Sequence, residues 1–330
     1  GAHTLNLYGG FTLSGGTFNA PTTLNNYTTF TLSGGTFNHC NNTVYLWGYA
    51  NYYVTTGGAT FWNLTFDKTD VDDRSIYLVD SFTVANDITF SKTGNHWFWV
   101  DKSPGVPVGS VVITVNGNMI YNAVNTYDAM QVGSDNPNYR LTFNLKGNFT
   151  MSPVDGENYF RANLNFTGTG NQTITKTAGT IDYGIWTINR PSEESGTAVY
   201  LGSNLTIDSY TTLVLTAGTL DLLTHGLSLN SYSTSYTQNG GTFNGANASS
   251  VTFVGGCYLY GGTFNAPNTD LNNYTTFTIT NATFNPGTGR VNFYANDSEY
   301  AITPNGRSFH SVRFIKTGGS NRYVWVSQSF

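Results

Sequence analysis

Apolar residues return at a fixed short period along this chain, and that period constrains the fold more than any other feature. Matching apolar positions recur about every 19 to 20 residues, as in Phe11 and Phe30, Phe18 and Phe37, and Leu24 and Val44. Within each group the apolar residues alternate with polar ones, which is the period of a strand with one buried face. Three short strands per coil fit this spacing best. The sequence therefore predicts an all-β fold, a parallel β-solenoid with coils of about 19 to 23 residues.

A second repeat is much longer. Residues 15–21 return unchanged as residues 261–267, and residues 24–31 return as 271–278. We expect one continuous solenoid over 1–330. Its predicted parts are regular coils over 1–90, a less regular module with longer loops over 91–160, regular coils over 161–246, and a repeat of 1–83 over 247–330.

The repeat also predicts how the two ends are placed. Phe330 matches Phe82 and Leu205, which precede further strand residues, and Gly1 matches a position close to Asn247. We therefore expect both ends to lie inside coils, where unpaired strand edges need a partner. Two hypotheses follow. The 330 residues are a window from a longer tandem array, or separate chains stack head to tail. Both predict a fibre, because a head-to-tail contact does not close on itself.

Two runs resemble a known family. Residues 34–44, GGTFNHCNNTV, and residues 60–65, TFWNLT, are similar to the GTFNHNNGTV and TFYNLT repeats of large bacterial surface and secreted β-strand-repeat proteins. The resemblance covers most of the chain except the irregular module. It implies an extracellular or cell-surface location and an adhesin-like or fibre-forming role, and it implies no particular activity. Cys40 stands where that pattern has Asn or Gly.

Charge is scarce and mildly acidic. Charged residues make up 10% of the chain, with 14 Lys and Arg against 19 Asp and Glu, whereas an ordinary domain has roughly 25%. Nucleic acids and membrane surfaces both select a basic face, so neither is an expected partner. No apolar run reaches the length of a membrane span, and the absence of a signal peptide or initial Met leads us to expect a mature or excised piece.

The two cysteines, Cys40 and Cys257, are too far apart in a solenoid to form a disulfide within one chain. Their positions in the sequence place them about ten coils from each other. We therefore expect two buried free thiols, and pairing between neighbouring chains is the alternative.

No residues form a recognisable catalytic or metal site. General acid and base catalysis needs two carboxylates on a shared face, and fragments of the pectin-hydrolase signature occur only in the wrong order. We therefore predict no enzyme activity, no metal and no cofactor, and we keep a polysaccharide-degrading enzyme as the third hypothesis. Asp67, Asp70, Asp72 and Asp73 form the densest acidic stretch. Calcium binding is one interpretation of it, and a solvated loop is the preferred one.

Aromatic residues supply the alternative function. Trp97 and Trp99 flank Phe98 in one predicted strand, and exposed rings on a solenoid are able to stack on sugars. A cell-surface adhesin that binds glycans through these two rings is therefore the alternative to a structural fibre. An ice-binding face would need threonines in successive coils. The Tyr-Thr-Thr triplets at 27–29, 210–212 and 274–276 are too far apart for that.

Eleven Asn-x-Ser/Thr sequons make N-glycosylation a candidate modification, although the composition alone predicts roughly as many by chance. Among them Asn26 and Asn273 occupy matched positions of the long repeat, where we expect turns. The sequons lie at Asn26, Asn41, Asn63, Asn148, Asn165, Asn171, Asn204, Asn247, Asn273, Asn281 and Asn296.

Overall fold

The chain is an all-β parallel β-solenoid of about 13 coils, each roughly 23 residues long, which confirms the predicted fold class. This computed structural model describes residues 3–69, 72–107, 109–124, 128–154, 157–192, 194–295, 299–317 and 323–327. The chain divides into two compact units. The first comprises Gly1–Asn165 and Lys176–Tyr183, and the second comprises Phe166–Thr175 and Gly184–Phe330.

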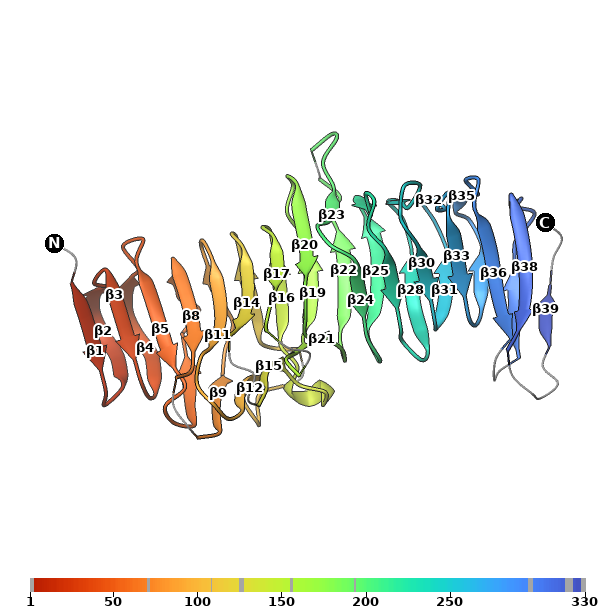
Figure 1. Ribbon diagram of the computed structural model, residues 1–330. Helices are drawn as coiled ribbons and strands as arrows, with labels where there is room; N and C mark the ends of the chain where they lie inside the picture. Colours follow the sequence, from red (N-terminus) through yellow and green to blue (C-terminus); the bar gives the residue numbers. More distant parts are fainter. Residues whose placement is uncertain are drawn as a thin grey trace. The chain divides into compact units, whose positions relative to one another are not determined.

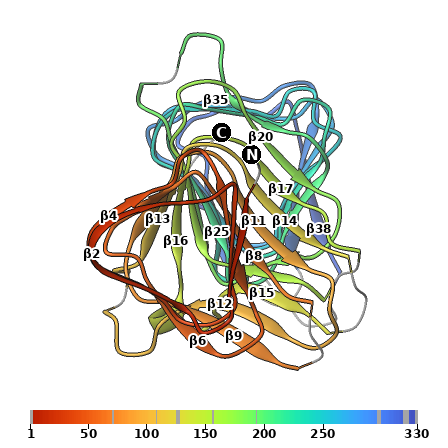
Figure 2. The same cartoon turned by 90° about the vertical axis from the view of Figure 1, so that its left-hand side faces the viewer.

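Three parallel sheets form the sides of the first unit. Figure 2 shows its coils end-on, with β8, β11 and β14 on one side, β9 and β12 on a second, and β13 and β16 on a third. The first sheet contains β1 (Thr4–Leu7), β3 (Thr23–Asn26), β5 (Thr43–Trp47), β8 (Asn63–Asp67), β11 (Ile88–Lys92), β14 (Met119–Ala123) and β17 (Phe149–Met151). The second contains β2 (Phe11–Asn19), β4 (Phe30–Asn38), β6 (Tyr52–Thr55), β9 (Arg74–Leu78), β12 (Phe98–Lys102), β15 (Met130–Gly133), β18 (Tyr159–Arg161) and β21 (Thr180–Ile181). The third contains β7 (Thr60–Phe61), β10 (Phe82–Val84), β13 (Val112–Val115), β16 (Thr142–Leu145) and β19 (Asn163–Phe166).

The second unit is also built from three parallel sheets. One contains β20 (Gln172–Lys176), β23 (Val199–Leu201), β26 (Thr219–Asp221), β29 (Thr242–Asn244), β32 (Thr263–Asn265) and β35 (Thr283–Asn285). Another contains β22 (Ile185–Asn189), β25 (Thr212–Ala217), β28 (Thr234–Gln238), β31 (Gly256–Leu259), β34 (Phe277–Ile279), β37 (Tyr300–Thr303) and β39 (Val324–Val326). The last contains β24 (Leu205–Ile207), β27 (Leu227–Leu229), β30 (Val251–Phe253), β33 (Asp270–Asn273), β36 (Arg290–Ala295) and β38 (Ser311–Lys316).

Coil length varies within the first unit. Leu5 pairs with Leu24 in a short, regular coil, whereas Ile88 pairs with Met119 across a distinctly longer stretch of chain. The longest coils exceed the predicted length because their extra residues leave the strands as loops. Figure 1 shows such loops at the lower ends of β9, β12 and β15, where the short 3-10 helix Pro137–Tyr139 also lies.

The core consists of side chains that stack on their equivalents in the next coil. In the second unit Phe264 is fully buried, and its ring is parallel to those of Phe243 and Phe284, at centroid distances of 4.4 and 5.7 Å. In the first unit Phe66 and Phe90 stack in the same way at 5.3 Å. In-register pairing places like residues above one another, and that is why a short sequence repeat becomes a continuous apolar column.

Outward-facing asparagines form a second kind of column. The Asn25 amide donates to Asn6 Oδ1 at 2.7 Å in the first unit, and Asn285 donates to Asn265 at 2.7 Å in the second. Each amide both donates and accepts, so one residue type satisfies its neighbours from coil to coil without any charge. The low charge content is therefore compatible with a polar surface.

We predict that Phe264→Ala lowers the free energy of unfolding by about 3 to 5 kcal/mol, because it removes a buried ring from the middle of a stacked column. Urea denaturation followed by circular dichroism measures this loss. Thr263→Ala is the matched control on the outer face of the same strand, and its expected effect is within about 0.5 kcal/mol. Equal effects of the two substitutions would contradict the stacked core.

Candidate functional site

Trp97 and Trp99 lie on the outer face of the second sheet of the first unit, at and beside β12. Both are partly exposed. Their rings are nearly parallel, with centroids 5.4 Å apart, and the Trp97 ring is also parallel to Tyr159 at 6.3 Å. These ring contacts are of the kind that a stacked sugar would make. A saccharide bound at Trp97 would therefore compete with partners that the protein itself supplies.

A charged cluster lies beside these rings, centred on Arg161 of β18. Arg161 Nε and Nη2 donate to the two carboxylate oxygens of Asp182 at 2.8 and 3.2 Å, and Nη1 donates to Gln131 Oε1 at 2.9 Å. The guanidinium also lies over the rings of Tyr159 and Tyr183, at 4.2 and 5.4 Å from their centroids. A bidentate pair with so many partners fixes the side chain of Arg161 in one orientation.

Asp101 is the unusual titratable group of this face. Burial, followed by the negative charge of Asp135, raises the pKa of its carboxyl to about 8, although Arg161 opposes the shift. Its Oδ1 atom is buried and has no hydrogen-bond partner among the described residues. Val100 pairs with Val132, so the residue opposite Asp101 is Gly133, which has no side chain to contribute. Burial therefore favours the protonated form of Asp101.

The acidic stretch of the sequence does not converge on one point. Asp72 pairs with Arg74, Asp73 accepts from the Trp97 amide at 2.9 Å, and Asp67 accepts from the Lys68 amide at 2.8 Å. Asp70 lies outside the described residues. Within the described ranges no group of three or more His, Cys, Asp or Glu side chains is arranged to hold a metal ion.

The sequons differ sharply in accessibility. Asn26 and Asn273 are fully buried, and their side-chain amides donate to the carbonyls of Thr28 and Thr275. The prediction that these two matched asparagines sit at turns is wrong: each is the last residue of a strand, and its side chain is buried. Asn63 and Asn165 are half-buried, and Asn296 lies outside the described residues. The exposed sequons are Asn41, Asn148, Asn171, Asn204, Asn247 and Asn281.

Both cysteines are free, but their environments differ. Cys257 is buried in β31, and burial raises the pKa of its thiol well above the usual range. Cys40 is exposed, which corrects the expectation of two buried thiols. It lies in the turn after β4 with a φ of 51°, and the following Asn41 also has positive φ. The tight turn directs this side chain to solvent.

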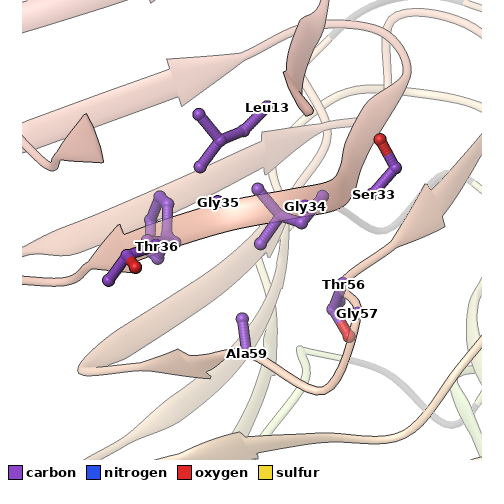
Figure 3. Close-up of a pocket in the computed structure, with 10 residues that line it drawn as sticks. Leu13, Ser33, Gly34, Gly35, Thr36, Thr56, Gly57 and Ala59 are labelled. Carbon is purple, nitrogen blue, oxygen red and sulfur yellow. The ribbon is translucent and has the colours of Figure 1, made fainter. Parts of the chain in front are cut away.

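A cavity of about 340 Å³ opens beside β4, between Leu13 and the turn that contains Thr56 and Gly57 (Figure 3). Gly35 lines it with a φ of 77°, and a Cβ atom there would lie 2.6 Å from the Gly16 carbonyl oxygen. The carboxylate of Asp80 holds the turn by accepting from the amides of Thr56 and Gly57. The residues that line the cavity are apolar, glycine, serine or threonine, so they supply no acid or base.

Sequence reasoning missed the Asp101 and Arg161 cluster. Its members come from four different coils and carry no local motif. One signal was available, because Arg161 and Asp182 have opposite charges and a sequence separation of 21, close to the length of one coil. That signal is useful only when the local coil length is known.

Comparison with known proteins gives no relative. No protein-family model, no curated protein sequence and no solved structure matches the chain. In the described part of the chain no helix is long and apolar enough to cross a membrane.

We predict that Asp101→Asn makes the folded protein more stable at alkaline pH. The unfolded carboxyl loses its proton near pH 4, whereas the folded one keeps it up to about pH 8. The contribution of Asp101 to stability is therefore fully present below pH 4 and is lost as the pH rises to 8. We expect a gain of about 3 to 5 kcal/mol at pH 9 and almost none at pH 4. Thermal unfolding at both pH values measures it, with the exposed Asp72→Asn as control, and a pH-independent effect would contradict the assignment.

We predict that glycosylation, where the host performs it, avoids Asn26 and Asn273 in the folded protein. Their amide nitrogens are buried and already donate to backbone carbonyls. Glycopeptide mass spectrometry of secreted protein should find sugars only at exposed sequons such as Asn148 and Asn204. A sugar on Asn26 or Asn273 in folded material would contradict the inward placement of these side chains.

Proposed function

We propose that this protein is a structural segment of an extracellular filament or surface fibre, assembled by end-to-end stacking of β-solenoid coils. The observation that carries the proposal is that each unit repeats one kind of contact from coil to coil. Parallel strands pair in register, and phenylalanines and asparagines stack on their equivalents. A contact of this kind has no built-in limit to its number of copies.

The long repeat supports the proposal at β1. Leu5 of β1 matches Val251 of β30 in the repeat. Val251 is fully buried and pairs with Leu227 of the preceding coil on one side and with Leu271 on the other. Leu5 pairs with Leu24 on one side and is 37% exposed. The strand type to which β1 belongs therefore accepts a coil on both edges.

β38 carries an exposed apolar side chain as well. Phe314 is 52% exposed, and it borders a cavity of about 410 Å³ with Ile315, Val324 and Val326. Its counterpart in the repeat is Phe66, which is fully buried under Phe90 of the following coil. An additional coil seated on β38 and β39 would bury the exposed side chains in the same way.

The extracellular location rests on two features of the sequence. Neutral Thr, Ser and Asn side chains provide most of the polar surface, and residues 34–44 and 60–65 resemble repeats of bacterial surface and secreted proteins. Both features fit a passive, stiff element outside the cell. The resemblance supports this location, and secretion of the full chain is the direct test of it.

We predict that the purified chain forms elongated particles visible by negative-stain electron microscopy. Leu5→Asp and Phe314→Asp should each shorten or abolish them, because an unpaired carboxylate would be buried at the contact. Thr83→Asp, on the outer face of β10, is the control and should leave the particles unchanged. A monodisperse monomer of 35.9 kDa without elongated particles would overturn the proposal.

A further inference from the structure

Two pairs of tyrosines stack across successive coils, one pair in each unit. In the first unit Leu7 pairs with Asn26, so Tyr8 and Tyr27 lie directly opposite each other. Their rings are 4.6 Å apart with an interplanar angle of 15°. Tyr27 opens the Tyr-Thr-Thr triplet at 27–29, so the structure gives this recurrent motif a place in the fold: it turns the chain out of a strand and presents the ring at the corner.

The second unit holds a similar pair, with Tyr294 where the first copy of the repeat has Trp47. Tyr274 is the counterpart of Tyr27, and the pairing of Asn273 with Phe293 places Tyr294 opposite it. These rings are 4.2 Å apart with an interplanar angle of 5°. A close, parallel tyrosine pair therefore occurs in each of the two units.

The phenol groups of each pair also lie at the same edge of the stack. Burial and then the neighbouring phenols of Tyr8 and Tyr49 raise the pKa of Tyr27, and a hydrogen bond with the Tyr8 hydroxyl contributes. Burial and then Tyr294 raise the pKa of Tyr274 in the same way. Parallel rings with interacting hydroxyls bring the carbons ortho to each oxygen near one another. These are the carbons at which two phenoxyl radicals couple.

We propose that Tyr8 with Tyr27, and Tyr274 with Tyr294, are sites of oxidative cross-linking to dityrosine. A peroxide, used by a haem peroxidase, is the oxidant that the reaction requires. Each phenol loses one electron and one proton, the two radicals form a carbon–carbon bond between ortho positions, and the ortho hydrogens move to oxygen as the rings regain aromaticity. The balance is two tyrosines and one hydrogen peroxide giving one dityrosine and two waters.

Among the described residues, the other tyrosine pairs are wider or more tilted. Tyr258 and Tyr260 are parallel within 14°, but their ring centroids are 5.9 Å apart. Tyr53 and Tyr77 are 5.4 Å apart and tilted by 30°, and Tyr210 and Tyr232 are edge-on at 62°. Solvent access favours oxidation of the pair Tyr8 and Tyr27, because Tyr8 is 70% exposed and a diffusing oxidant is able to reach it. Tyr232 is equally exposed, so it is the natural control for exposure without parallel stacking.

The cross-link would join consecutive coils covalently. It would close one loop between Tyr8 and Tyr27 and a second between Tyr274 and Tyr294, each about one coil long. Closing such loops constrains the unfolded chain and raises the melting temperature. This would serve the structural role proposed above, but it requires only a folded single chain, and it therefore stands or falls independently of filament formation.

The test uses dilute monomeric protein treated with hydrogen peroxide and a haem peroxidase. We expect dityrosine fluorescence in the monomer band, a higher melting temperature, and peptides that have lost two hydrogens per linked pair. Arg290 lies between Tyr274 and Tyr294, so trypsin separates these residues unless they are linked. No Lys or Arg lies between Tyr8 and Tyr27, so pepsin is the protease for that pair.

Tyr-to-Phe variants assign the dityrosine signal to particular residues, because they keep the ring and remove the hydroxyl group. Tyr8→Phe and Tyr294→Phe should each remove one linked peptide pair, and the double variant should remove both together with most of the monomer fluorescence. Tyr232→Phe should change neither. Linkage through other tyrosines, linkage only between chains, or an unchanged signal in the double variant would overturn the proposal.

Discussion

The structure depends on the parallel hydrogen-bond ladder between successive coils. Because the ladder is in register, residues separated by one coil length meet face to face, as Leu5 meets Leu24 and Phe264 meets Phe284. Each side chain then has its own kind as a neighbour, and this converts a one-dimensional repeat into columns of rings and amides. The buried core, the polar surface and the corner tyrosines all follow from this single alignment.

The scarcity of charge is a consequence of the same alignment. Charged residues placed in register would stack like charges coil upon coil, which is unfavourable, whereas asparagine and threonine are able to pair with copies of themselves. The exceptions are instructive. Arg161 meets the opposite charge of Asp182, and Asp101 lies opposite a glycine and keeps its proton. A charged residue is tolerated on this face where the next coil supplies the opposite charge, and a buried carboxyl is tolerated where its neutral form is favoured.

The charged and aromatic cluster also coincides with long coils. Ile88 pairs with Met119 and Met119 with Phe149, and the loops of these coils surround the face that carries Trp97, Trp99 and Asp101. A solenoid accepts such insertions because the strands on either side of a loop keep their register. Differences in coil length are therefore taken up by the loops, while the strands on either side keep their pairing.

The sequence by itself determined the solenoid, because the periods of two and of about 20 residues admit few other folds. Its alternation of apolar and polar residues also predicted strands with one buried face. Only the tertiary structure decided what faces what. Asn26 looked like a turn residue but points inward, Cys40 proved exposed, and Arg161 found Asp182 one coil away. Tyr8 and Tyr27 also stack because they lie one coil apart. Such contacts depend on the exact number of residues in each coil. Loops of variable length change that number, so the sequence alone does not predict which residues meet.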